Sequence, residues 1–395
     1  MRVWISSAAL TLALTGCVAG YSGPVETAPM QENPVTFVTP PERDSADLQV
    51  LFWSDEQREQ RFREMENWFE GHEVKGPVEP RALPDGAPLN DTLAAEIRSL
   101  MESTNAAGVM VLQDGEKRFE SYRLGFGPEQ RWTSFSVAKS FTSTLLGAAI
   151  QDGFIGSLQD PVTQYIPELA GSAYEGVTVE QLATMTSGVA WNEDYTDPES
   201  DVAKMASFVL EYGEDAMVAQ MKELPREAPP GEKWVYKTGE TNLIGLLVEN
   251  AVGLPLAAYA KQKIIDPAGF EGDLFWMSDP RGGSIGGCCL SIRLADYARM
   301  GQFALEGGNG VVPDGWFAEA GGPQVKFDDP GLGYGYQWWT YPGGNYGARG
   351  IFGQSISLVP EKNLVVAVVS NWPEAVVWEY SAGWPKLAQK IAAAE

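Results

Sequence analysis

Residues 131–150 read R-W-T-S-F-S-V-A-K-S-F-T-S-T-L-L-G-A-A-I, a run of small residues that leads into a strongly apolar helix. Ser136 and Lys139 stand at the start of this predicted helix, three residues apart. At that spacing the two side chains share one face, so the amine can reach the hydroxyl. The first N–H groups of a helix are unpaired and its dipole is positive there, which favours negative charge on a bound carbonyl oxygen. Ser136 therefore suits a nucleophile, although Ser is also an ordinary helix cap.

Two predicted β-hairpins lie toward the two ends of the chain. In residues 107–122 the segments V-M-V-L and R-F-E-S-Y are joined at Asp114-Gly115, a dipeptide that favours a tight turn. Residues 356–371 are rich in β-branched residues around a second turn, and a helix is expected from about 374 to 394. We predict an α/β fold, an antiparallel sheet built from both termini and flanked by helices, with a mostly helical insertion at about 140–345.

The N-terminal segment has the pattern of a secreted lipoprotein. Residues 1–16 combine a positive start with an apolar run too short to span a bilayer, which indicates a signal peptide. The L-T-G-C ending at Cys17 resembles the bacterial lipobox, in which the Cys carries the lipid; the alternative is an ordinary cleaved signal followed by an incidental Cys. Residues 17–48 read as a flexible tether, and 54–69 as a peripheral helix. We expect a cell-envelope lipoprotein on the periplasm-facing outer membrane.

Composition excludes several functional classes for the expected folded domain, residues 49–395. The formal net charge of the full 395-residue chain, −25, and the lack of a basic cluster argue against nucleic-acid binding. Cys288 and Cys289 are interpreted as small buried residues, because neighbouring cysteines rarely bond to each other. With His72 as the only histidine and no Cys/His cluster, neither a metal nor a cofactor is expected. A Ser-His-Asp triad would need His72, which lies in a peripheral segment.

Two later stretches add candidate groups for a site. Residues 234–247 read W-V-Y-K-T-G-E-T-N-L-I-G-L-L, in which Tyr236 is either a core aromatic or a proton shuttle whose pKa an ammonium such as Lys139 would lower. Residues 347–357 read G-A-R-G-I-F-G-Q-S-I-S, and these glycines allow close approach of a ligand. A free N–H at this edge, predicted at Ser355, would complete an oxyanion hole with the N–H of Ser136.

Taken in order, these stretches resemble the serine hydrolases of the class C β-lactamase and D-alanyl-D-alanine carboxypeptidase superfamily over about residues 55–390. The nylon-oligomer branch, 6-aminohexanoate-dimer hydrolase and its esterase relatives, is the most similar. Further runs that carry this resemblance are T-S-G-V-A-W-N-E-D-Y at 186–195 and C-L-S-I-R-L-A-D-Y-A-R-M-G at 289–301. The resemblance implies a β-lactamase-like fold.

The resemblance also implies roles for individual residues. Ser136 would be the acylated nucleophile, Lys139 its base and Tyr236 the group that passes a proton to the leaving group. Lys139 must then be neutral when it takes the proton, and burial would lower its pKa toward that state. Tyr195, in the E-D-Y run, would close over the substrate.

Two residues depart from the family pattern. Thr238 stands where β-lactamases usually carry Asn, and Phe352 where most relatives have His or Lys; together with Tyr195 and Gln354 they form the predicted substrate-binding set. Phe352 cannot bind a carboxylate, so we expect a small neutral ester or amide as substrate. The alternatives are a β-lactamase or D-alanyl-D-alanine carboxypeptidase, and a non-catalytic ligand-binding lipoprotein.

Overall fold

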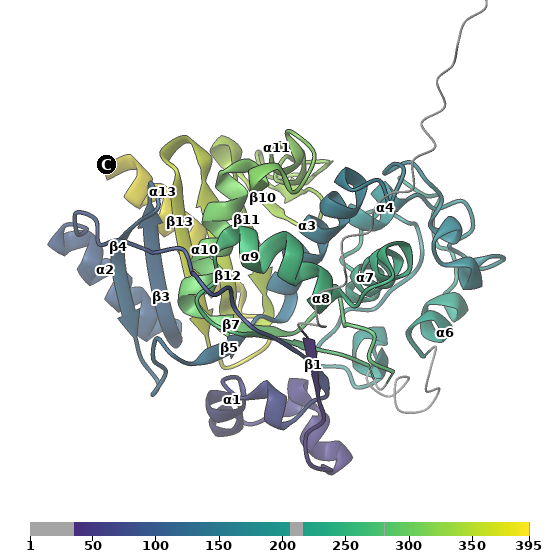
Figure 1. Ribbon diagram of the computed structural model, residues 1–395, viewed down its shortest axis with the longest axis horizontal. Coiled ribbons are helices and arrows are strands. Elements are labelled where there is room, and N and C mark those ends of the chain that lie inside the picture. The colour runs from purple at the N-terminus through teal and green to yellow at the C-terminus, as the bar shows by residue number, and fades with distance from the viewer. Residues whose placement is uncertain (1–34, 206–215, 280, 395) are drawn as a thin grey trace, which may run out of the picture. The chain divides into compact units, whose positions relative to one another are not determined.

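The structure is a computed structural model that describes residues 35–205, 216–279 and 281–394 (Figure 1). The predicted signal peptide, the lipidation site Cys17 and the first part of the tether lie outside the described residues. The described strands form two antiparallel sheets.

The larger sheet is built from both ends of the chain, as predicted. Its central strands β3 (Ala106–Gln113) and β13 (Leu364–Ser370) pair antiparallel, with Val111 opposite Val366. Within the described residues this sheet has eight strands in the order β4, β3, β13, β12, β11, β10, β9, β8. The remaining bounds are β4 Glu116–Tyr122, β12 Gln354–Val359, β11 Asn345–Gly350, β10 Trp339–Tyr341, β9 Gly333–Tyr334 and β8 Val325–Lys326.

The two predicted hairpins are confirmed. Asp114 and Gly115 join β3 to β4 with φ angles of 54° and 78°, the left-handed pair that a tight hairpin turn needs. The turn between β12 and β13 ends at Asn363, whose φ is 44°. Both turns use residue types that tolerate this conformation at low cost.

Helices cover both faces of this sheet (Figure 1). On one face, α2 (Asp91–Ser103) and α13 (Gly383–Ala394) pack on the central strands and share one apolar core with them. On the other face lies α10 (Leu294–Leu305). Its Gly301 lets the helix approach closely, since an added Cβ would lie 2.6 Å from Val365.

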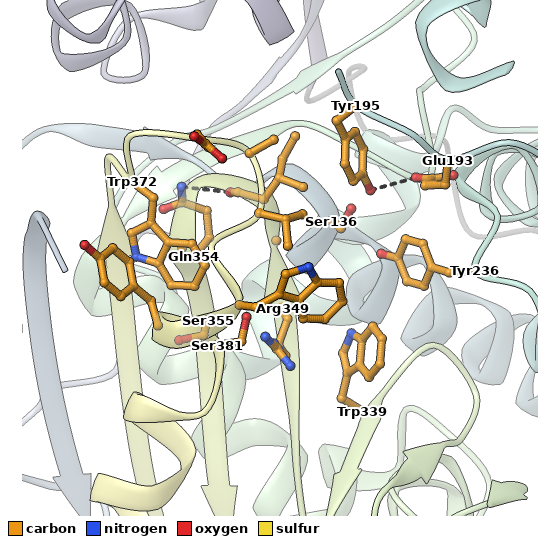
Figure 2. A pocket seen from close by; sticks show the side chains of 18 of the residues that line it. Ser136, Glu193, Tyr195, Tyr236, Trp339, Arg349, Gln354, Ser355, Trp372 and Ser381 are labelled. Carbon is orange, nitrogen blue, oxygen red and sulfur yellow. Dashed lines mark hydrogen bonds between the residues drawn. The ribbon is translucent and has the colours of Figure 1, made fainter. Parts of the chain in front are cut away.

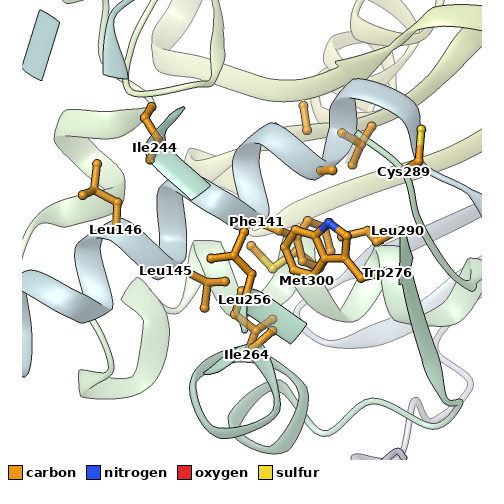
Figure 3. Close-up of a cluster of buried hydrophobic side chains, with 14 of the residues drawn as sticks. Phe141, Leu145, Leu146, Ile244, Leu256, Ile264, Trp276, Cys289, Leu290 and Met300 are labelled. Atoms are coloured by element: carbon orange, nitrogen blue, oxygen red, sulfur yellow. The ribbon is translucent and has the colours of Figure 1, made fainter. Parts of the chain in front are cut away.

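The helical region surrounds α3 (Ala138–Gln151), which is buried along most of its length and packs against α7 (Thr238–Val252). Figure 3 shows part of this core, to which Phe141 of α3 and Trp276 both contribute. The smaller helices are α4 Val179–Ala183, α6 Ala216–Glu223, α8 Leu256–Ala260, α9 Asp266–Ala268 and α11 Trp316–Ala320. Within the described ranges no single helix is long and apolar enough to cross a membrane, although the bent pair formed by α7 and residues 256–268 meets both criteria jointly.

The smaller sheet leads the chain into the stretch that contains Ser136. Its order is β1, β2, β6, β7, β5, with bounds β1 Val35–Val38, β2 Gly71–Val74, β6 Leu274–Met277, β7 Leu290–Arg293 and β5 Arg131–Thr133. Directly after β5, the 3-10 turn Phe135–Val137 carries Ser136 and continues into α3.

Several predicted bounds need correction. The peripheral helix is only α1 (Asp55–Arg61), capped by Ser54, and α13 begins at Gly383 after the short α12 (Trp378–Ser381). Strands β8 to β10 belong to the larger sheet, so the helical insertion ends before residue 325 rather than at about 345.

The interpretation of the two adjacent cysteines as unbonded residues is wrong. Cys288 and Cys289 form a disulfide bond with each other. Cys289 has a φ of 80°, which turns the backbone sharply just after Gly286 and Gly287. A chain that bends in this way brings two neighbouring side chains to one side.

Candidate active site

The turn that carries Ser136 is held by aromatic packing. Phe135 has a φ of 43°, an unfavourable conformation for a large side chain. Its ring is buried with centroids 5.0 Å from Phe62 and 5.3 Å from Phe352, and this packing holds the strained turn. Ser136 itself is half-buried and lines a cavity (Figure 2).

Lys139 lies on the first turn of α3 and is buried. Its Nζ donates hydrogen bonds to Thr238 Oγ1 at 3.0 Å and to the carbonyl oxygen of Gly287 at 2.7 Å. Burial lowers the pKa of Lys139 to about 8, against the opposing effect of the negative charge of Glu193. The expected lowering is therefore confirmed, and near pH 7 about a tenth of the amine is unprotonated.

Tyr236 lies beside both residues. Its hydroxyl is hydrogen-bonded to Ser136, and the Lys139 Nζ is 5.3 Å from the centroid of its ring. The expected lowering of its pKa is wrong: burial raises the pKa of Tyr236 well above its ordinary value, and the charge of Glu193 raises it further. The Ser136 hydrogen bond and the charge of Arg349 act in the opposite direction but are weaker. Tyr236 is thus a neutral phenol, which can pass a proton on but does not start as an anion.

Glu193 is a central residue that the sequence reasoning did not single out. Its carboxylate accepts hydrogen bonds from the Tyr195 hydroxyl at 2.8 Å, from the Thr238 N–H at 2.9 Å, and from the Thr238 hydroxyl and the Trp191 indole. Because Thr238 also accepts from Lys139, a continuous hydrogen-bonded chain joins Glu193 to the amine. The signal for it in the sequence is the E-D-Y run, of which Glu193 is the first residue.

Two of the predicted substrate-binding residues lie beside Ser136. Tyr195 and Thr238 both line cavities that reach Ser136. Their hydroxyls, however, are already engaged by Glu193, and Thr238 also holds Lys139. Thr238 therefore positions the site more than it offers a free group to a ligand.

The side chains of the other two, Phe352 and Gln354, are engaged within the protein. The ring of Phe352 is buried against Phe62 and Phe135 and lies under the Arg58 guanidinium, so the prediction that it contacts substrate is wrong. The Gln354 amide is used by the main chain of Ser370, to which it donates and from which it accepts at 2.9 Å. Gln354 borders the large cavity but fixes the sheet.

The predicted oxyanion contribution of Ser355 also needs correction. Ser355 lies in the interior strand β12, paired with Arg349 on one side and Val368 on the other, so its N–H is used within the sheet. The backbone next to Ser136 is instead that of Gly350, at the end of β11. An added Cβ there would lie 3.0 Å from the Ser136 nitrogen. The main chain at 350–351 is therefore the second side of a candidate oxyanion hole.

The large cavity beside Ser136 has a volume of about 560 Å³, within the range of small-molecule sites. Aromatic side chains contribute much of its wall, and Figure 2 shows Tyr236, Trp339 and Trp372 among them. The other aromatic lining residues are Tyr195, Trp234, Trp378, Tyr380 and Trp384. Arg349 reaches the same cavity from β11, with its guanidinium 5.4 Å from the centroid of the Trp339 ring.

His72, the histidine that a Ser-His-Asp triad would require, lies elsewhere. It stands on β2, with its ring 5.3 Å from that of Phe37. It is not among the described residues that line the cavities reaching Ser136. The position of His72 on β2 therefore gives no support to a Ser-His-Asp triad.

Comparison with known proteins assigns the family. A family model described as Beta-lactamase matches residues 93–380. The chain belongs to the beta-lactamase family. It is 31% identical over 306 residues to the 6-aminohexanoate-dimer hydrolase of Paenarthrobacter ureafaciens, covering 72% of this chain and 78% of that protein.

Solved structures show the same fold. A Bacillus anthracis protein named for 6-aminohexanoate-dimer hydrolase superposes with a TM-score of 0.78 at 19% identity, covering 90% of this chain and 98% of the other. A D-stereospecific amidohydrolase from Streptomyces sp. superposes with a TM-score of 0.59 at 19% identity, covering 73% and 96%. The chain thus has the β-lactamase-like fold predicted from its sequence, and it is a serine hydrolase of the beta-lactamase family.

Proposed function

We propose that this serine hydrolase cleaves an ester or amide bond of a small substrate through an acyl-enzyme formed on Ser136. The observation that carries the proposal is the hydrogen bond between Ser136 and Tyr236 at the edge of the cavity, next to a buried Lys139 whose pKa is lowered to about 8. A nucleophile, a base with a matched pKa and a neutral proton carrier stand together, which is what acyl transfer requires.

In the first step the neutral Lys139 amine takes the proton of the Ser136 hydroxyl while its Oγ attacks the substrate carbonyl. The oxyanion that forms accepts hydrogen bonds from the Ser136 N–H and from the main chain at 350–351. Lys139 is now an ammonium, already held by Thr238 and Gly287, so its charge appears in a site that has acceptors for it.

In the second step the tetrahedral intermediate collapses. The carbon–oxygen or carbon–nitrogen bond to the leaving group breaks, and the leaving atom takes the proton of the Tyr236 hydroxyl, which is replaced from Lys139. Water then attacks the acyl-enzyme, and its proton passes to Tyr236 while Tyr236 gives its own proton to Lys139. The bond between the acyl carbon and Ser136 Oγ breaks, Oγ takes a proton back from Lys139, and the carboxylic acid leaves. Tyr236 suits this role because its raised pKa keeps it protonated between turnovers.

A second candidate activity is hydrolysis of β-lactams or of D-alanyl peptides. The observation in its favour is Arg349, a cation on the wall of the large cavity that has no carboxylate partner among the described residues. Its guanidinium can accept a substrate carboxylate in a two-pronged contact. Arg349 would thus bind the substrate carboxylate, in place of the His or Lys that most relatives carry at the position of Phe352.

We also propose that the protein is a lipoprotein of the cell envelope, anchored through Cys17, on the basis of the signal-like residues 1–16 and the L-T-G-C motif. Incorporation of labelled fatty acid in the bacterial host, and its loss in Cys17→Ser, would test this. Labelling that persists in the variant would contradict it.

The catalytic proposal is tested with a fluorophosphonate probe and p-nitrophenyl esters. We expect the protein to be labelled and to hydrolyse the esters, and Ser136→Ala to do neither. Ser381→Ala is the matched control, because Ser381 lines the same cavity without contacting Tyr236 or Lys139 among the interactions described. Absence of labelling and of turnover in the unmodified protein would refute the proposal, and fast nitrocefin turnover with poor ester turnover would favour the second candidate.

A further inference from the structure

Ser136 stands between two cavities. Besides the large aromatic cavity, a second one of about 150 Å³ reaches the same serine. Its walls, among the described residues, are mostly aliphatic, sulfur-containing or aromatic, and include Leu51, Phe69, Met205, Met217, Met277 and Ile285. A substrate bound at Ser136 therefore has two separate spaces for the two parts that flank its scissile bond.

The position of Tyr236 decides which part enters which cavity. Tyr236 lines the large cavity and is not among the residues that line the small one. In the proposed mechanism Tyr236 gives its proton to the leaving atom, so the leaving group must extend on its side of Ser136. The oxyanion points to the main chain at 350–351, and the remaining substituent of the tetrahedral carbon is the acyl chain.

We propose, building on the proposed function, that the small cavity is the acyl-binding pocket and the large aromatic cavity holds the leaving alcohol or amine. Thr238 lines the acyl pocket, and its hydroxyl is bound to Lys139 and Glu193. The acyl chain thus passes beside the groups that hold the catalytic base.

The size and lining of the small cavity define the acyl group. An apolar cavity of about 150 Å³ in another protein binds benzene, so this one takes roughly six carbons beyond the carbonyl. None of its described lining residues is charged, and the side-chain amide of Asn242 is already bound to Gly287 and Met205. A charged group at the end of the acyl chain would lose its hydration there without a partner. The substrate class is therefore an ester or amide with a neutral, apolar acyl chain.

Flexible methionines make the pocket tolerant in shape. Three of its walls are the thioether side chains of Met205, Met217 and Met277, which adapt to irregular ligands. We therefore expect selectivity for the length and neutrality of the chain more than for one branching pattern. Each methylene that is buried should raise kcat/KM by about fourfold until the pocket is full.

The test uses two series of esters with the full-length protein. In the first the leaving group is p-nitrophenol and the acyl chain grows from acetyl to decanoyl; in the second the acyl group is acetyl and the alcohol grows. We expect Met277→Trp, which fills the small cavity, to lower the heptanoyl-to-acetyl ratio of kcat/KM at least about tenfold. Met277→Ala should shift the optimum to longer chains, which keeps the test informative if the larger residue disturbs folding.

The matched control acts on the other cavity. Trp378 lines the large cavity and is 80% exposed, so Trp378→Ala should change the alcohol series while leaving the acyl ratio unchanged. A further pair of probes differs only in charge: the heptanoyl ester and the equally long 6-aminohexanoyl ester. We expect the neutral ester to react at least about tenfold faster.

The pocket assignment would be overturned if Met277→Trp altered the alcohol series and Trp378→Ala altered the acyl series. In that case fluorophosphonate labelling of Ser136 would still support the proposed function. Equal rates for the heptanoyl and 6-aminohexanoyl esters would overturn the neutral-chain inference in the same way. Absence of labelling and of all ester turnover in the unmodified protein would instead overturn the proposed function, and the pocket assignment with it.

Discussion

Replacing Glu193 by Gln should move the pH dependence of catalysis to lower pH. Glu193 is an anion joined to Lys139 through the Thr238 hydroxyl, and its charge raises the pKa of Lys139. Without that charge the ammonium form of Lys139 loses a stabilising partner. The amine then becomes neutral, and hence active as a base, at a lower pH.

The magnitude follows from the geometry. Lys139 Nζ and a Glu193 oxygen both bond to Thr238 Oγ1, so the two charges lie within about 6 Å of each other. Unit charges at that distance interact by about 3 kcal/mol at an effective dielectric constant of about 20. Glu193 is half-buried, so water reduces this to about 1.4 kcal/mol, or about one pH unit.

The assay is the pH profile of kcat/KM for a p-nitrophenyl ester. The unmodified protein should gain activity as Lys139 loses its proton, with a midpoint near its pKa of about 8. In Glu193→Gln we expect the midpoint about one unit lower. The limiting value of kcat/KM at high pH should fall as well, because Tyr195 and Thr238 lose a strong hydrogen-bond acceptor. That limiting value depends on the geometry of the site, whereas the midpoint of the profile depends on the charge near Lys139.

Asp194→Asn is the matched control. Asp194 is the next residue, lines the same large cavity, and is bonded to Thr196 rather than to the chain that reaches Lys139. Its midpoint should stay at that of the unmodified protein. An unchanged midpoint in Glu193→Gln, or one that moves to higher pH, would refute the assignment of Lys139 as the base that Glu193 controls.

Three further outcomes are expected. Tyr236→Phe should lower kcat for esters by about 10²- to 10⁴-fold, whereas Tyr334→Phe, which changes a buried ring 6.1 Å away, should keep most activity; similar losses in both would contradict a proton-carrying role. Gly350→Ala should slow fluorophosphonate labelling at least about tenfold, because the new Cβ would lie 2.6 Å from a carbonyl oxygen of the serine turn, and an unchanged rate would show that this backbone does not border the reacting carbonyl. The peptide that contains Cys288 and Cys289 should gain two hydrogens in mass on reduction, and equal masses before and after would exclude the disulfide.

The parts of the fold that could be predicted are those with a local cause. Asp114-Gly115 favours a hairpin turn in any context, and the β-branched run after residue 356 favours strands. The three-residue spacing of Ser136 and Lys139 needs only helix geometry, and the lowered pKa of Lys139 follows from the apolar character of its helix. Each of these features is determined by residues that are close to one another in the sequence.

The parts that could not be predicted depend on distant partners. Whether Gly350 or Ser355 lies beside the oxyanion depends on the register of β11 and β12, and the sequence of residues 347–357 does not determine that register. The ring of Phe352 turns away from the cavity because Phe62, nearly 300 residues earlier, packs against it. The pKa of Tyr236 rises because burial outweighs the nearby cation, and burial is a property of the whole fold.

The pairing of β3 with β13 has a consequence for how the protein is made. Residues 106–113 have their sheet partner at 364–370, so the central ladder cannot form until residue 370 has left the ribosome. Contacts so far apart in sequence form slowly, because the chain loses conformational entropy before the strand pairing contributes any stabilisation. Until then the apolar strand β3 has an open edge toward its missing neighbour and is exposed to aggregation. Loss of residues 364–395 would remove β13 and with it the partner of β3, so hydrolysis should appear only after this strand has been made.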